Sequence, residues 1–240
     1  MTFASAKITL SKTFDHATSC SSENSAILLA PIYDAMLLEL GRQGGVLLSA
    51  EEKSKLQAVM FPNGKLGSAT TAQPVAKICE LAGLTRPELA RATFLMVEEQ
   101  GAGRDFPFSG EKLCPVLALY RARDFDHAFA LTQSIYDYQG NGHSVGIHTQ
   151  DDAHIMQLGL EMTVCRVIVN QAHCIANGGS FDNGLPFSLS MGCGTWGGNS
   201  FSENLNYRHF LNTTRIVRTI APDEPSSDEI FAGYRAKHGI

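Results

Sequence analysis

The sequence lacks several features that would place it in a specialised class of protein. It contains no apolar run of about eighteen residues, so no membrane-spanning helix is expected. Its first residues, MTFASAKITLSK, lack the long apolar core of a signal peptide, and a cytoplasmic location is expected. The net charge of −5 gives no excess of basic residues, which argues against nucleic-acid binding.

Cysteines are present but lack the spacing of a disulfide or zinc framework. None of the six forms a C-x-x-C pair, and a disulfide network is unexpected in a chain of this size and composition. A zinc site from Cys165, His173, Cys174 and Cys193 can be imagined, but the spacing does not match the usual paired ligands. We therefore expect no metal. Glycine-rich nucleotide motifs, either a phosphate loop or a strand-to-helix G-x-G-x-x-G, are also missing.

The chain alternates short apolar runs with helical patterns. Strands are predicted at 25–30, 92–98, 116–122, 144–149 and 165–171, and helices at 31–45, 49–60, 74–84, 124–140 and 151–162. Helices between continuous apolar strands predict an α/β fold of three layers, α/β/α, with a largely parallel sheet covered on both faces. Right-handed crossovers then bring the strand ends to one edge, where sites collect.

The pattern changes from about residue 177. The segment NGGSFDNGLPFSLSMGCGTWGGNS is rich in glycine and polar residues and has no helical period. Loops of this length are usually functional or disordered, and the Trp, Phe, Met and Leu content argues against disorder. A late strand at 212–221 and a short helix at 226–239 are predicted to close the chain.

One cysteine stands in an unusual setting. Cys20 lies in the polar stretch TSCSSENS, just ahead of the apolar run AILLA, whereas a structural cysteine belongs in the apolar run itself. Its small neighbours let a substrate carbon approach, and local backbone N–H groups could lower the thiol pKa and hold an oxyanion. The alternative is an incidental loop cysteine.

Two further residues are candidates for a site. Glu111 precedes a proline and a strand in EKLCPVLALY. The alternative interpretation is an ordinary surface charge. His143 lies in the glycine-rich turn GNGHSVGIHT, where it could be a base, a hydrogen-bond donor or a solvated turn residue. The glycines of GCGTWGGNSFSEN let the backbone pass close to a ligand, although such a loop alone is weak support.

Four motifs in this order and spacing, SKTFDHATSCSSENSAIL, EKLCPVLALYRARDFDHA, GNGHSVGIHT and MGCGTWGGNSFSENLNYRHFLNTTRI, resemble the catalytic half of the aldehyde dehydrogenase superfamily. The match is to its CoA-acylating branch and runs from about Ser11 to Val217. Within that branch, NQAHCIANGGSFDNGLPFSLSMGCGTWG most resembles acylating sulfoacetaldehyde dehydrogenases, with succinate-semialdehyde relatives close behind. The resemblance implies a catalytic domain over 1–217 and a C-terminal tail with a short helix over 218–240.

The resemblance also implies roles. Cys20 is the nucleophile and its backbone N–H forms part of the oxyanion hole, Glu111 hydrogen-bonds the nicotinamide ribose, and His143 acts near the thioester. NAD or NADP accepts a hydride, CoA takes the acyl group from the cysteine thioester, and no metal takes part. The implied partners are a small aldehyde and CoA. A homo-oligomer is also expected, because the face that the cofactor-binding half would cover should be apolar and exposed.

The family places a cofactor-binding half ahead of the cysteine, and these residues do not include it. We therefore expect this chain alone to fold but to be inactive as a dehydrogenase. Three alternatives remain open: a hydrolytic aldehyde dehydrogenase domain, a non-catalytic assembly module, and a hydrolase using Cys20 with His143. For the last, the sequence names no third group to orient the histidine.

Overall fold

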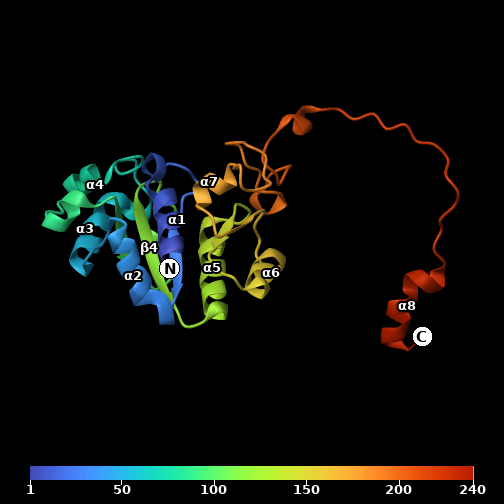
Figure 1. Cartoon of the computed structure of the whole chain (residues 1–240), viewed down its shortest axis with the longest axis horizontal. Helices are drawn as coiled ribbons and strands as arrows, with labels where there is room; N and C mark the ends of the chain where they lie inside the picture. Colours follow the sequence, from blue (N-terminus) through green and yellow to red (C-terminus); the bar gives the residue numbers. More distant parts are fainter. Residues whose placement is uncertain (240) are drawn as a thin grey trace. The chain divides into compact units, whose positions relative to one another are not determined.

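The structure is a computed structural model that describes residues 1–239. Its residues fall into two compact units, Met1–Asn206 and a shorter one that begins at Tyr207. Within the described residues, no helix is long and apolar enough to cross a membrane. Figure 1 shows the course of the chain.

The first unit contains two parallel sheets and seven helices. The strands are β1 (Ser25–Leu29), β2 (Gly45–Leu47), β3 (Phe94–Glu98), β4 (Val116–Ala122), β5 (Val145–Ile147) and β6 (Val167–Val169). The helices are α1 (Thr2–Thr13), α2 (Tyr33–Arg42), α3 (Ala50–Met60), α4 (Val75–Ala82), α5 (Phe125–Gln139), α6 (Asp152–Glu161) and α7 (His173–Asn177).

The larger sheet has the strand order β1-β4-β3-β2, and every neighbouring pair is parallel. Alternate residues of a strand point to opposite faces, so β3 feeds two separate cores. Leu95 and Val97 pack in the core that α3 and α4 cover, while Phe94 and Met96 pack in the core that α1 and α2 cover. The predicted three-layer α/β/α fold with a parallel sheet is confirmed.

The smaller sheet pairs β5 with β6, also in parallel. Its apolar cluster is small and has four buried members, Val145, Leu158, Met162 and Val164, with partly buried residues of α5, β5 and β6 around them. This region therefore buries less apolar surface than the four-stranded sheet.

Several predicted elements form where expected, and others differ. Helix α3 begins with the capping box that Ser49 and Glu52 predict, and β4 covers the predicted range 116–122. The predicted helix over 31–45 ends early because residues 45–47 form β2 beside β3. Helices α1 and α7 were not predicted, since neither begins with a side chain that caps its N-terminus.

The second unit, as far as it is described, contains a short 3-10 turn, Tyr207–Phe210, and helix α8 (Ser227–His238). Helix α8 starts with a capping box between Ser226 and Glu229. The strand expected at 212–221 is not formed, and these residues are exposed. A strand needs a partner for its backbone N–H and C=O groups, and within the described residues none pairs with this segment. The domain boundary at residue 217 stays a prediction.

Candidate active site

Cys20 lies in a tight turn between α1 and β1, and its side chain is exposed. The backbone enters this turn through Asp15, His16 and Ala17, all of which have positive φ, at 47°, 50° and 54°. Left-handed backbone costs non-glycine residues roughly 1–2 kcal/mol each. The Thr18 hydroxyl offsets part of that cost by bonding the carboxylate of Asp15 at 2.7 Å. Such strain is typical of turns that present functional groups.

The base of the turn is tied to two helix ends. The Nδ1 atom of His173 bonds the Ser21 carbonyl at 2.8 Å, and the Ser22 hydroxyl donates to the Ser11 carbonyl at 3.4 Å. The backbone N–H of Cys174 in turn donates to the Ser11 hydroxyl at 2.9 Å. The end of α1 and the start of α7 therefore hold the segment behind the thiol.

His143 reaches Cys20 from the loop before β5. Its Nε2 lies 3.3 Å from the Cys20 sulfur, and its Nδ1 lies 2.7 Å from the hydroxyl of the next residue, Ser144. Gly142 makes this approach feasible, because it has φ of +109° and a Cβ there would lie 2.5 Å from the Cys193 carbonyl oxygen. The glycine-rich segment thus packs directly beside the histidine turn.

Arg166, which the sequence analysis did not single out, joins these segments. Its Nη1 donates to the carbonyls of Gly192 at 3.0 Å and His143 at 3.4 Å, and its Nε donates to Asn204 at 3.0 Å. The side chain is buried. The available signal was an arginine inside the apolar run CRVIVN, since buried charges occur where they are hydrogen-bonded.

Glu111 lies on a neighbouring segment and is exposed. Its backbone N–H donates to the Gln139 side chain at 3.0 Å, and the next N–H, of Lys112, donates to Asn24 in the Cys20 turn at 2.9 Å. Glu111 lines an open pocket of about 250 Å³, together with Phe61, Gly64, Lys65, Leu66, Pro107, Gly110, Tyr138 and Gln139. Within residues 1–239 its carboxylate makes no hydrogen bond or ion pair, so it can accept hydrogen bonds from a ligand in this pocket.

Cys20 is coupled electrostatically to Glu111, whereas His143 is shifted by other neighbours. Partial burial, with the carboxylate of Glu111 as the next cause, raises the pKa of the Cys20 thiol. The backbone N–H groups of Cys20 and Ser21 lower that pKa, as expected, but burial and Glu111 outweigh them. Burial, then His173 and Arg166, lower the pKa of His143 to about 4. At neutral pH the pair is therefore a thiol and a neutral imidazole.

The remaining cysteines differ from Cys20. Cys79, Cys114 and Cys174 are buried, whereas Cys165 and Cys193 are partly exposed. The strand predicted at 165–171 begins only at Val167, so Cys165 precedes it and is partly exposed. Within residues 1–239, no three His, Cys, Asp or Glu side chains gather as metal ligands.

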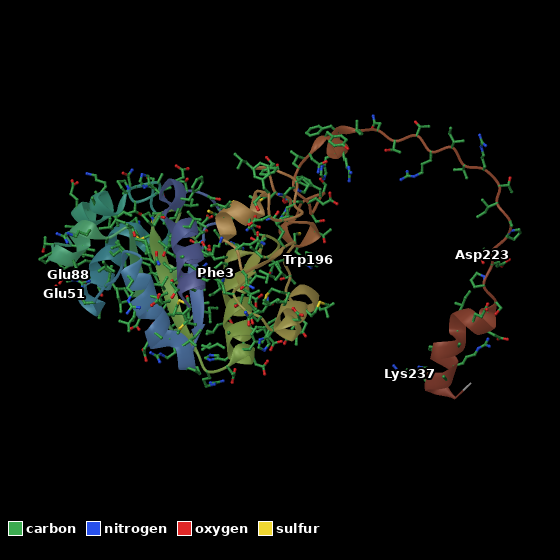
Figure 2. All side chains as sticks on the ribbon, in the orientation of Figure 1. Phe3, Glu51, Glu88, Trp196, Asp223 and Lys237 are labelled. Atoms are coloured by element: carbon green, nitrogen blue, oxygen red, sulfur yellow. The ribbon has the colours of Figure 1, made fainter. Side chains whose placement is uncertain are left out.

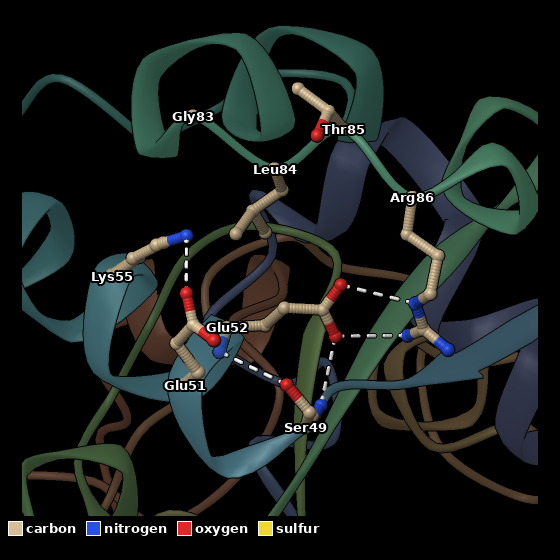
Figure 3. Close-up of a pocket in the computed structure, with 8 residues that line it drawn as sticks. All are labelled: Ser49, Glu51, Glu52, Lys55, Gly83, Leu84, Thr85 and Arg86. Atoms are coloured by element: carbon tan, nitrogen blue, oxygen red, sulfur yellow. Dashed lines mark hydrogen bonds and ion pairs between the residues drawn. The ribbon is translucent and has the colours of Figure 1, made fainter.

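Two surface features lie outside this constellation. Trp196 of the glycine-rich segment is 55% exposed, and Figure 2 labels its position. A second open pocket, of about 320 Å³, lies at the start of α3 (Figure 3). Its charged groups already have partners, since Glu52 bonds Arg86 and Glu51 pairs with Lys55. It offers no free charged group to a ligand and contains none of the candidate residues.

No protein-family model matches the sequence, but individual proteins are similar to it in sequence and in fold. An acylating sulfoacetaldehyde dehydrogenase of Cupriavidus necator is 55% identical over 98% of this chain and 48% of its own length. An acetylating succinate-semialdehyde dehydrogenase of Clostridium kluyveri is 36% identical over 89% of this chain and 47% of its own. The crystal structure of an acetylating aldehyde dehydrogenase from Geobacillus thermoglucosidasius superposes with a TM-score of 0.87 at 32% identity, covering 94% of this chain and 49% of that one.

In fold and in sequence, the chain therefore corresponds to about half of an aldehyde dehydrogenase. More particularly, it matches the acylating enzymes, and its similarity to sulfoacetaldehyde dehydrogenases confirms the resemblance that the four motifs predicted. The chain spans about half the length of the curated relatives it matches.

Proposed function

We propose that Cys20, His143 and Glu111 form the cysteine-bearing half of the active site of a CoA-acylating aldehyde dehydrogenase. The observation that carries the proposal is the exposed Cys20 sulfur 3.3 Å from His143 Nε2, on a turn that is tied to the Glu111 segment through Asn24. Cys20 adds to the aldehyde carbonyl, and the N–H donors of the turn hold the oxyanion of the resulting thiohemiacetal. Glu111 holds a nicotinamide ribose, and His143 acts near the sulfur.

The bound NAD or NADP would supply the hydride acceptor, which no group of this chain can replace. The acyl group left on Cys20 then passes to the thiol of CoA, and because one thioester replaces another, little free energy is lost. The names of the similar enzymes favour an aldehyde with an anionic end, sulfoacetaldehyde or succinate semialdehyde. A cytoplasmic location and a homo-oligomer remain part of the proposal.

The proposal is tested in two ways. First, brief iodoacetamide treatment of the 240-residue chain followed by peptide mapping should label Cys20 ahead of the other five thiols, since it is the exposed one. Preferential labelling of Cys165 or Cys193 would contradict the assignment of the nucleophile.

Second, the chain should replace the matching half of the Cupriavidus necator enzyme in a chimera, which is then supplied with sulfoacetaldehyde, CoA and NAD or NADP. Acyl-CoA should form, and Cys20→Ser should abolish it while leaving the fold intact. Release of the free acid would favour the hydrolytic alternative, and activity that survives Cys20→Ser would favour a non-catalytic role. The chain alone should produce no NADH, because one ribose contact supplies only on the order of a few kcal/mol of binding free energy.

A further inference from the structure

We propose that Ser144 is a positioning residue that keeps the proton of neutral His143 on Nε2, so that His143 donates a hydrogen bond to the Cys20 sulfur and does not act as its base. The inference rests on the proposed function, in which Cys20 is the nucleophile, and it assigns the role of the histidine beside it. Ser144 contacts the sulfur only through His143.

The Ser144 hydroxyl is buried beside the ring of His143. The residue is 6% exposed, and its Oγ lies 2.7 Å from His143 Nδ1. Within residues 1–239 the structure shows no other hydrogen bond from this hydroxyl. A buried hydroxyl has one proton and needs an acceptor for it. If Nδ1 carried its own proton, the Ser144 proton would be left without a partner, so Oγ–H donates and Nδ1 accepts.

The acceptor role of Nδ1 decides which tautomer His143 adopts. A neutral imidazole carries one proton, and when Nδ1 is the acceptor this proton lies on Nε2. Nε2 is the atom 3.3 Å from the Cys20 sulfur. The hydrogen bond therefore runs from His143 to the sulfur.

The His143 ring does not take up a second proton at neutral pH. Two neighbours of His143 oppose a second proton: the Arg166 guanidinium bonds its carbonyl oxygen, and His173 bonds the Ser21 carbonyl in the Cys20 turn. Burial and these two neighbours bring the pKa of His143 to about 4. Glu111, the nearby carboxylate, acts on the thiol and is not among the causes that shift His143.

His143 Nε2–H therefore donates a hydrogen bond to the Cys20 sulfur whenever the sulfur carries a negative charge. Cys20, which is exposed, loses its thiol proton to water before it attacks the aldehyde as a thiolate, and it is a thiolate again when the acyl group leaves it. A neutral N–H stabilises both states. A base of such low pKa would be poorly matched to a thiol whose own pKa is raised.

The direct test is the nitrogen NMR spectrum of the 240-residue chain with ¹⁵N-labelled histidine at pH 7.5. His143 is assigned by the signal that disappears in His143→Ala. We expect its Nε2 to carry the proton and Nδ1 to show the shift of an unprotonated nitrogen; the reverse pattern overturns the proposal. Ser144→Asp offers Nδ1 an acceptor and should move the proton to Nδ1, whereas Ser144→Thr, which keeps the hydroxyl, should leave it on Nε2.

The matched control is Ser134→Ala, which removes an exposed hydroxyl from α5 and should leave the His143 signals unchanged. Signals of the other seven histidines show whether each variant is folded. An unchanged tautomer in folded Ser144→Asp overturns the role of Ser144.

The functional readout is the pH dependence of Cys20 alkylation. The side-chain amide of Gln can donate a hydrogen bond but cannot take up a proton. At pH 7.5 His143→Ala should therefore slow alkylation about tenfold, and His143→Gln should recover most of the rate. Equal losses in both variants, or a wild-type rate that stays high below pH 6, would mean that an imidazolium forms and would overturn the proposal. If Cys20 is not the preferred thiol in any variant, the proposed function fails, while the NMR result still decides the tautomer.

Discussion

The four-stranded sheet and the two-stranded sheet each contribute one side of the candidate site, and they are stabilised differently. The turn that carries Cys20 runs directly into β1 of the larger sheet, whose central strands β3 and β4 are buried on both faces. His143 precedes β5 of the smaller sheet, where an apolar cluster of four buried residues is supplemented by the hydrogen bonds of Arg166. The distance between sulfur and imidazole therefore depends on the less apolar of the two regions.

The largest effect should come from the larger sheet. Phe94 of β3 is 0% exposed and packs in the core beneath α1 and α2. Phe94→Ala should lower the free energy of unfolding by about 4 kcal/mol, because it removes a large apolar side chain and leaves a cavity. Urea unfolding followed by circular dichroism measures this. Leu160→Ala, at a position 77% exposed, is the control and should change stability by less than about 0.5 kcal/mol.

His173 lies where the two regions meet, and it predicts a dependence on pH. Burial lowers its pKa from 6.5 to about 4. A group whose folded pKa is lowered contributes stability above its unfolded pKa and loses it as the pH falls through the folded value. We expect a contribution of about 3 kcal/mol that disappears between pH 6.5 and pH 4.

The measurement compares urea unfolding of wild type and His173→Gln across that range. The wild type should lose stability more steeply as the pH falls. Glu23, whose pKa burial raises to about 7, changes stability in the opposite direction, but both proteins contain it. Parallel pH curves for the two proteins would show that His173 does not titrate as its burial requires.

Replacing Arg166 should destabilise the smaller sheet and leave the larger sheet unchanged. Arg166→Met keeps the length of the side chain but removes its bonds to His143, Gly192 and Asn204. Buried carbonyls that lose a charged donor should cost about 2 kcal/mol. Hydrogen exchange should therefore speed up at the amides of β5 and β6 and remain slow in β4. Arg121→Met, at an exposed ion pair with Asp34 on the larger sheet, is the matched control. Equal acceleration in both sheets would show that they unfold as one unit.

What the sequence could predict follows the same division. Strand β4 and helix α3 were predictable because a continuous apolar run and a capping box are local signals. The exposure of Cys20 was predictable because it lies in a polar turn outside the apolar run. The contact of Lys112 with Asn24 spans 88 residues, and no local pattern encodes it. The roles of Ser144 and Arg166 likewise appear only once β5, β6 and the glycine-rich segment are brought together.

The segment 212–221 shows the opposite failure. Its β-branched residues favour a strand, but strand propensity describes how a residue fits into a sheet and provides no partner. Within the described residues no strand lies beside it. The strand propensity of this segment therefore predicted a strand for which the described residues provide no neighbouring strand.

The smallest expected effect acts on Cys20 through the charge of Glu111 alone. The carboxylate of Glu111 raises the pKa of the Cys20 thiol, second only to burial. Glu111→Gln removes that negative charge, so the thiolate becomes easier to form and Cys20 should be alkylated about two to three times faster at pH 7.5. The gain should shrink in high salt, because Glu111 is exposed and its charge is screened. Glu161→Gln, at an exposed position of α6, should leave the rate unchanged. In the chimera the same Glu111→Gln change should slow hydride transfer while the thiol remains reactive, since the carboxylate is assigned to the ribose. A variant that lost thiol reactivity but kept normal hydride transfer would place Glu111 on the proton path of Cys20 and not on the cofactor.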